Sequence, residues 1–270
     1  MEIELRILWT GIVLYVLGGG LAIGAVVLKK HPERAILGML TAGWLLHTMA
    51  LLVRWERLGH GPFVTMYEIL SSNIWSLVLA FLIAYWRIPR IRPSAAVVMP
   101  ILFVMMGWLV VSSPGEAHLP RSFRTPWLYI HVGFGKVFLG AVLVAVGLAG
   151  AIQLRRWAIG RHWFERLPED RRLDDLAYRC MAIGLIFNGL MLVSGAIWAQ
   201  DAWGRYWAWD PLETWSFITW LLLAVALHVR ITFKPSPRVS SSMAFVVFAI
   251  AFLTFFGVPF LSTGPHQGTF

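Results

Sequence analysis

The most distinctive stretch of the sequence runs from residue 203 to residue 215 and reads WGRYWAWDPLETW. Its indole rings offer broad, rigid apolar faces, which suit a planar apolar ligand, and Arg205 is placed to meet an acidic group on that ligand's edge. Heme has this shape and carries propionates. The alternative is an ordinary aromatic belt, since tryptophan is enriched at membrane boundaries whatever a protein does. The tryptophans concerned are Trp203, Trp207, Trp209 and Trp215.

The carboxylates of this stretch have a structural explanation. Asp210 stands where a helix N-cap is expected, Pro211 follows at the first helical position and Glu213 at the third. This order is typical of a helix start, because an N-cap carboxylate accepts hydrogen bonds from the first backbone amides. We therefore expect Asp210 and Glu213 to begin the next helix rather than to carry out chemistry.

Three histidines form the second candidate group. His131 and His266 are expected at the same membrane level as the tryptophans, while His228 follows Thr214 by fourteen residues. That spacing places His228 roughly 21 Å deeper along a helix, inside the bundle. Two imidazoles beside an aromatic surface can supply both axial ligands of a heme iron, and a deeper histidine can hold a heme on its way there. The alternative is that each histidine makes a separate structural hydrogen bond.

Other ionisable residues in apolar segments have weaker patterns. His47 lies inside the second apolar segment, where a histidine either contacts a ligand or bonds to a neighbouring helix. Lys136 follows His131 closely and is explained by snorkelling toward the polar boundary. Cys180 is the only cysteine, which excludes a disulfide framework, a CxxC motif and a cysteine metal site. Any reacting thiols must therefore belong to a partner.

The elements that position these residues are membrane helices. The chain is 58% hydrophobic and 14% charged, far outside the range of soluble domains. Eight apolar segments are each near the roughly 20 residues that a helix needs to cross the bilayer. They are residues 7–28, 35–53, 68–86, 95–112, 127–154, 178–199, 214–232 and 242–260. The prediction is an all-α polytopic membrane helical bundle, with residues 1–270 forming one domain and the first segment kept as an uncleaved anchor.

Basic residues fall in alternate connections. Of the 23 lysines and arginines, 16 lie in four connections, and the largest of these is residues 155–179. By the positive-inside rule these connections face the cytoplasm, which predicts both termini and the Trp-rich loop, residues 200–214, on the outer face of the inner membrane. This distribution of basic residues explains the net charge of +9, so binding to nucleic acid is not needed to account for it. Apolar residues near Trp163 predict a helix on the membrane surface within residues 155–179, which contain no nucleotide-binding glycine pattern.

Several motifs together resemble a known family. WGRYWAWDPLETW is similar to the tryptophan-rich (WWD) signature of heme-handling proteins of cytochrome c maturation. GHGPFVTMYE, LYIHVGFGK, TWLLLAVALHVR and GVPFLSTGPH resemble, in this order, motifs of the CcsA (ResC) family, a subunit of the System II cytochrome c synthase. The resemblance implies the eight-span bundle, with His131 and His266 as outer axial ligands of heme iron and His228 as an intramembrane ligand.

The same resemblance implies a function and partners. The chain is expected to move heme b to the outer face and to present it to the CxxCH segment of apocytochrome c. A CcsB (ResB) subunit would supply a second intramembrane histidine, so that heme lyase activity belongs to the two subunits together. Thioredoxin-like proteins would keep the apocytochrome thiols reduced. The residues expected around the heme are Trp203, Arg205, Trp207, Trp209, Asp210 and Trp215.

Three other functions stay open from the sequence. A heme-delivery protein that loads a separate heme chaperone shares the Trp-rich loop but does no thioether chemistry, and its relatives are expected to have fewer spans. A b-type cytochrome in quinone electron transfer predicts paired histidines at two depths, whereas His131 and His266 are expected at one surface. A purely structural assembly factor is the third.

Overall fold

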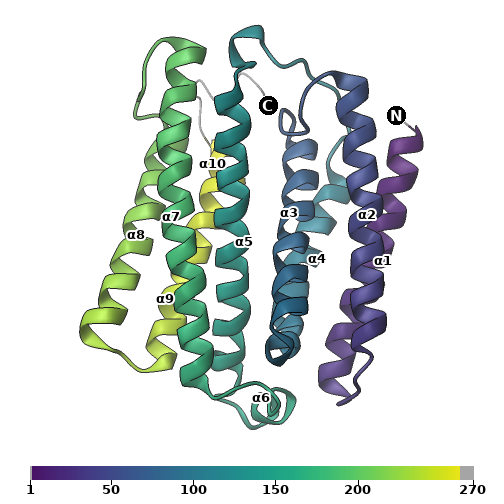
Figure 1. Cartoon of the computed structure of the whole chain (residues 1–270), viewed down its shortest axis with the longest axis vertical. Helices are drawn as coiled ribbons and strands as arrows, with labels where there is room; N and C mark the ends of the chain where they lie inside the picture. The colour runs from purple at the N-terminus through teal and green to yellow at the C-terminus, as the bar shows by residue number, and fades with distance from the viewer. Residues whose placement is uncertain (1, 262–270) are drawn as a thin grey trace.

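The computed structural model describes residues 2–261, which form a bundle of long helices with no β-strand among them (Figure 1). Eight helical segments in this part of the chain are long and apolar enough to cross a membrane, which confirms the predicted all-α bundle. α1 begins, and α10 ends, at the end of the bundle that carries the Trp-rich loop. The helices are α1 (Glu2–Val27), α2 (Glu33–Leu58), α3 (Met66–Arg87), η1 (Pro89–Ser94), α4 (Ala95–Val111), η2 (Arg121–Phe123), α5 (Pro126–Leu154), α6 (Ala158–Trp163), α7 (Asp170–Trp203), α8 (Pro211–Phe233), α9 (Pro237–Phe252), η3 (Leu253–Gly257) and α10 (Val258–Leu261).

The largest basic connection differs from its prediction. α7 begins at Asp170 rather than near residue 178, so its first turns come from this connection. The expected membrane-surface helix is reduced to the six residues of α6, and Phe164 and Leu167 turn into the core. Arg155 explains the turn, because its guanidinium donates hydrogen bonds to the backbone oxygens of Phe164 and Leu167. A fork of five donors suits several carbonyls at once.

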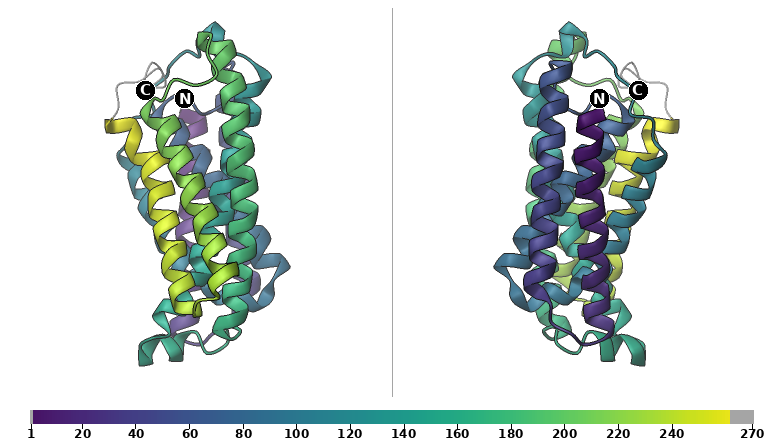
Figure 2. Two further views of the ribbon diagram at one scale, coloured as in Figure 1. Left: turned by 90° about the vertical axis from the view of Figure 1, so that its left-hand side faces the viewer. Right: turned by 90° about the vertical axis from the view of Figure 1, so that its right-hand side faces the viewer.

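α5 lies at the centre of the bundle, where it packs against α3, α4, α7 and α9 (Figures 1 and 2). Small residues in its middle let the neighbouring helices approach closely. At Gly140, for example, a Cβ atom would stand 2.6 Å from the Cβ of Ala80 in α3, so a larger residue would push the two helices apart. α5 therefore joins the group α1–α4 to the group α7–α9 and carries His131 between them.

A buried ion network ties α1, α2 and α3 to the connection between α4 and α5. Arg54 donates to Glu68 Oε1 at 2.8 Å, to Glu4 Oε1 at 3.0 Å and to a backbone oxygen of that connection at 2.7 Å. All three side chains are buried, and complete pairing is what makes such burial tolerable. Arg57 extends the network to exposed Glu116, and its hydrogen bond lowers the pKa of that carboxyl below its ordinary value.

The π-helical turn η3 follows α9 and leads into α10. A π turn contains one residue more than the α-helix around it. The hydroxyl of Thr254 donates to the backbone oxygen of Ile250 at 2.8 Å and lies 3.0 Å from the Thr219 hydroxyl of α8. These contacts hold the π turn against α8, with Thr254 and Phe255 directed into the cavity described next.

Candidate functional site

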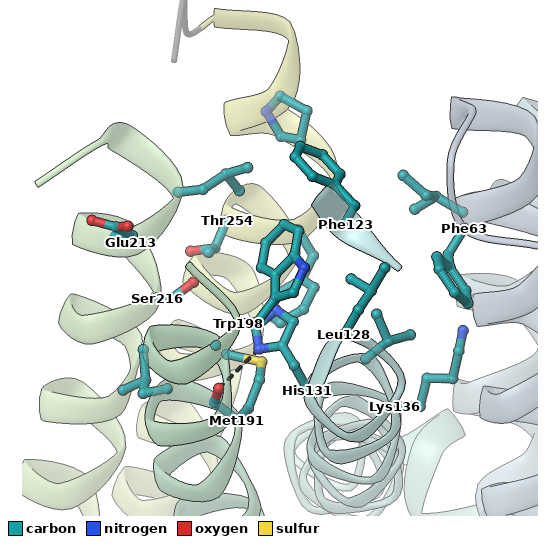
Figure 3. Close-up of a pocket in the computed structure, with 18 of the residues that line it drawn as sticks. Phe63, Phe123, Leu128, His131, Lys136, Met191, Trp198, Glu213, Ser216 and Thr254 are labelled. Atoms are coloured by element: carbon teal, nitrogen blue, oxygen red, sulfur yellow. Dashed lines mark hydrogen bonds between the residues drawn. The ribbon is translucent and has the colours of Figure 1, made fainter. Parts of the chain in front are cut away.

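A cavity of about 210 Å³ lies at the end of the bundle that carries the Trp-rich loop (Figure 3). Its walls come from α5, α7, α8 and the π turn, and its roof comes from the connections before α3 and α5. Apolar and aromatic side chains surround a few polar groups, which is the usual pattern of small-molecule pockets. The lining includes Phe63, Leu119, Phe123, Leu128, His131, Lys136, Met191, Trp198, Trp207, Glu213 and Thr254.

His131 lies in the wall of this cavity, on the second turn of α5. Its Nδ1 is 2.8 Å from the backbone oxygen of Met191 in α7. Because a carbonyl oxygen only accepts hydrogen bonds, the neutral ring carries its proton on Nδ1 and its lone pair on Nε2. Metal-binding histidines are commonly oriented in this way, with one ring nitrogen bonded to a carbonyl and the other used for coordination.

Trp198 and Gly195, on the same helix as Met191, also fix the His131 ring. Trp198 stacks on the imidazole, with ring centroids 6.1 Å apart and an interplanar angle of 17° (Figure 3). Gly195 leaves room for the ring, since a Cβ atom there would stand 2.6 Å from Nδ1. Neither residue was predicted from the sequence. The signal was present, however, because Met191, Gly195 and Trp198 are spaced by four and three residues and so share one helix face.

Among the described residues, the indole rings of the Trp-rich loop meet one another and Trp198 edge to face rather than as one flat surface. Trp203 meets Trp198 at 74° with centroids 4.9 Å apart, and Trp207 meets Trp209 at 83° with centroids 5.7 Å apart. The quadrupoles of aromatic rings favour such crossings over flat arrays. Trp207 lines the cavity, Trp203 packs against Trp198, and Trp209, whose backbone is left-handed (φ 57°), is 69% exposed. Trp215 is half-buried on α8, outside the lining.

Asp210 and Glu213 begin α8, as their order in the sequence predicted. Asp210 is the N-cap, and its Oδ1 accepts the backbone amide hydrogen of Glu213 at 2.9 Å. Glu213 Oε2 accepts the backbone amide hydrogen of Ala208 at 2.7 Å, which closes the loop onto the helix. The second oxygen, Glu213 Oε1, is buried without a hydrogen-bond partner among the described residues. Since Glu213 also lines the cavity, this oxygen can accept a donor from a ligand.

The basic side chain of the cavity is Lys136 rather than Arg205. Arg205 is exposed and lies outside the lining. Lys136 lines the cavity, and its Nζ donates to the Ser72 hydroxyl of α3 at 2.9 Å. The snorkelling expected of Lys136 is therefore replaced by a contact between helices. In the described part of the chain its amino group has Ser72 as hydrogen-bond partner and forms no salt bridge with a carboxylate. A ligand carboxylate would be its first anionic partner.

His228 lies away from the cavity. It is exposed on α8, with Nε2 3.5 Å from the Thr232 hydroxyl, so the expectation of a histidine inside the bundle is wrong. Ala226 and Leu227 form the buried side of α8 at this level, and the next residue is turned by roughly 100° around the helix. α8 stands at the edge of the bundle, and its main contacts with the described residues are to α7, α9 and the segment after α9 (Figure 1).

The other two histidines from the sequence have separate outcomes. His266 lies outside the described residues. His47 is fully buried between helices, where Nε2 is 2.9 Å from Ser71 Oγ and Nδ1 is 3.5 Å from the Tyr15 hydroxyl. Both contacts cross to neighbouring helices, which supports the structural alternative for His47.

Comparison with known proteins identifies the family. Residues 36–266 match the family described as Cytochrome C assembly protein. The chain belongs to this cytochrome c assembly family. Its members named Cytochrome c biogenesis protein CcsA are similar along most of the chain, which confirms the resemblance seen in the motifs. The protein of Prochlorococcus marinus (strain MIT 9301) is 31% identical, covering 92% of the chain and 88% of the relative. The protein of Synechococcus sp. (strain CC9605) is 30% identical, covering 96% of the chain and 94% of the relative.

A solved structure shows the same fold. The protein named Cytochrome c Heme Lyase CcmF superposes with a TM-score of 0.70 at 21% identity, covering 99% of this chain and 48% of CcmF. The chain therefore spans about half the length of that structure. Family membership gives the chain a role in cytochrome c maturation, and its eight membrane-length helices make it a multi-pass membrane protein.

Proposed function

We propose that this member of the cytochrome c assembly family receives heme b as its substrate and holds it at the cavity for attachment to apocytochrome c. The observation that carries the proposal is the oriented imidazole of His131, with its lone pair on Nε2, in the wall of an apolar and aromatic cavity. Heme iron accepts such an imidazole as an axial ligand. His266, beyond the described residues, is proposed as the second axial ligand.

The cavity is suited to hold only part of a heme. Its volume of about 210 Å³ is below the roughly 300–1,000 Å³ of pockets that enclose a small ligand. One edge of the porphyrin would then stay accessible, as a substrate that is passed to another protein requires. Trp198 and Trp207 would contact the ring face, and Lys136 would pair with a propionate in place of Arg205. Asp210 and the other tryptophans would act through the shape of the loop.

The proposed attachment needs no nucleophile from this chain. A thiol of the CxxCH segment adds across each heme vinyl group, so that a C–S bond forms on one vinyl carbon and the thiol hydrogen ends on the other. The addition is redox-neutral once the thiols are reduced, and we assign that reduction to thioredoxin-like partner proteins. The histidine of CxxCH replaces one outer axial ligand. The chain contributes by positioning, and Cys180 lies far away, in the third turn of α7 at the opposite end of the bundle.

His228 has a separate place in the proposal. Because it faces out of the bundle from α8, a partner subunit can reach it. A CcsB-type subunit that supplies another histidine would complete a bis-histidine heme site at this surface. Heme would pass from there to the cavity, with the Trp-rich loop on the outer face of the cytoplasmic membrane. The two subunits together would then form the cytochrome c synthase.

Heme binding by the purified two-subunit complex tests the proposal. The decisive variant is His131→Ala, and the matched control is His118→Ala, an exposed histidine at the same end of the bundle and outside the cavity. We expect His131→Ala to lose the bis-histidine absorption spectrum and cytochrome c maturation. Added imidazole should restore both in part, because it fills the space left by the ring. His118→Ala should behave as the wild type.

The possible results separate the functions. A wild-type complex without heme, or a His131→Ala complex that matures cytochrome c normally, would refute the proposal. A wild-type complex that binds heme but never forms thioether bonds with a CxxCH peptide would instead support heme delivery to another protein.

A further inference from the structure

A second cavity lies at the opposite end of the bundle, between the α1–α2 turn, η1 and the segment that follows α6. Its volume is about 330 Å³, larger than that of the cavity at the Trp-rich loop. One wall is apolar and is built by Ala22, Val26 and Ile36 of α1 and α2. The rim is charged. The proposed handling of heme at His131 does not use this cavity.

The rim carries more positive than negative charge. Lys29 Nζ donates to both carboxylate oxygens of Glu165, at 2.9 and 2.8 Å, so this carboxylate is already used. Glu33 lies 3.8 Å from His31 Nδ1 rather than beside a lysine or arginine. A bound anion would therefore balance the excess positive charge of the rim. Its cations are Lys29, Lys30, Arg90, Arg92 and Arg166, and its carboxylates are Glu33 and Glu165.

Four of these cations form no salt bridge with a carboxylate in the described part of the chain: Lys30, Arg90, Arg92 and Arg166. Arg92 is held in place by Tyr85, since Nε donates to the Tyr85 backbone oxygen at 3.2 Å and the guanidinium lies 5.2 Å from the centre of the ring. Arg166 Nη1 is 2.8 Å from His31 Nε2. Lys30 and Arg90 are exposed and are free to turn toward a ligand. Two fixed guanidinium groups and two adjustable cations thus surround one space.

We propose that this cavity binds a phosphate-bearing anion, supplied in the membrane by the headgroup of an acidic phospholipid. Guanidinium groups match phosphate oxygens in charge and geometry, and the apolar wall suits the glycerol and the first acyl carbons. Basic pockets between membrane helices on the cytoplasmic side are known to bind such headgroups. The basic connections gather at this end of the bundle, which we expect to face the cytoplasm.

Heme fits this cavity less well. Among the described residues, His31 is the only histidine in the lining, and both of its ring nitrogens contact Arg166. The cavity also lies on the α1–α2 side of the bundle, whereas His228 is on α8 at the other edge (Figure 1). A heme held here would have neither an available iron ligand in the lining nor a neighbouring heme site.

Native mass spectrometry of the delipidated chain in a neutral detergent tests the proposal. Phosphatidylglycerol, phosphatidylcholine and free glycerol 3-phosphate are added in separate arms. The test variant is Lys30→Gln with Arg90→Gln. The matched control is Lys234→Gln with Arg238→Gln, which removes the same charge at the same end of the bundle but outside the cavity. Removing two of the surface cations should weaken phosphatidylglycerol binding about thirty-fold.

Each outcome decides something. Preferential binding of phosphatidylglycerol, lost in the test variant and kept in the control, supports the site with a lipid headgroup as the source. Equally strong binding of glycerol 3-phosphate, lost in the same variant, supports the site with a free phosphate as the source. Equal binding of phosphatidylglycerol and phosphatidylcholine overturns the proposal. Equal loss of phosphatidylglycerol binding in the test and control variants also overturns it. So does heme binding that is abolished in the test variant and kept in the control.

Discussion

Gly195→Ala tests whether α7 positions the imidazole of His131. The new methyl group would stand 2.6 Å from Nδ1 and 2.8 Å from Cε1, where ordinary contact begins at 3.4 Å. Raising the distance to Nδ1 from 2.6 Å to 3.4 Å requires the ring to move by roughly 0.8 Å or α7 to move away from α5. In both cases the hydrogen bond from His131 Nδ1 to the Met191 oxygen, now 2.8 Å long, is lost or badly strained.

The expected magnitude of this change follows from three contributions. Overpacking a buried position costs about 1–3 kcal/mol, and losing a hydrogen bond costs about 0.5–1.5 kcal/mol. Alanine returns about 0.5–1 kcal/mol because it favours the helix more than glycine does. The free energy of unfolding should therefore fall by about 0.5–4 kcal/mol. Heme affinity should fall by about 10–100-fold, since an iron ligand would lose the carbonyl that orients it.

The assay compares Gly195→Ala with Gly133→Ala. Gly133 is also helical, two residues after His131, and a methyl group there meets nothing within 4 Å. Denaturant unfolding in detergent gives the stability, and a titration followed by heme absorption gives the affinity. Gly133→Ala should be as stable as the wild type or slightly more so, with unchanged heme binding. Wild-type stability and heme affinity in Gly195→Ala would refute the reasoning that α7 positions the ring.

Two further predictions concern charged side chains. Lys136→Met should weaken the binding of heme at least tenfold, the equivalent of one charge-assisted hydrogen bond, but should leave binding of heme dimethyl ester unchanged. In the same titrations, Arg205→Gln should change neither the binding of heme nor that of its dimethyl ester. If Lys136→Met weakens the binding of both ligands equally, the propionate contact is contradicted. Glu68→Gln should lower the free energy of unfolding by about 3 kcal/mol, because it removes a buried partner of Arg54. The exposed substitution Glu116→Gln should cost far less, because solvent screens an exposed ion pair. Equal losses of the two variants in denaturant unfolding would argue against the network.

The helices were predictable from the sequence for a physical reason. Lipid cannot hydrogen-bond to the backbone, so each crossing must be a helix, and its apolar length shows where it lies. The start of α8 was predictable because Asp210 and Glu213 satisfy backbone amides locally. The direction in which His228 points was not predictable. Lipid and the core of the bundle are both apolar, so the hydropathy of a membrane helix does not show which side faces the protein.

The sequence predicted which types of residue form the candidate site, but it did not predict how they are arranged. His131 and Trp207 share a cavity, as their expected membrane level suggested. Trp198 completes the cavity from α7, and Lys136 is held in the wall by Ser72 of α3, so both placements depend on which helices pack against α5. Trp209 departs from the prediction because its backbone takes a left-handed conformation within the loop. The spacing of aromatic residues shows that rings are close together and does not fix the angles between them.

The π turn at residues 253–257 makes this end of the bundle sensitive to the number of residues as well as to their types. Deleting one residue would remove the extra member of the π turn and let the α-helix run on without interruption. The helix after this point would keep its orientation, because a π turn absorbs one extra residue, but the wide turn that directs Thr254 and Phe255 would close. Thr254 and Phe255 would leave the cavity wall although no apolar character had been lost. Insertions and deletions here should therefore be more harmful than substitutions, and natural length variation should fall outside this turn.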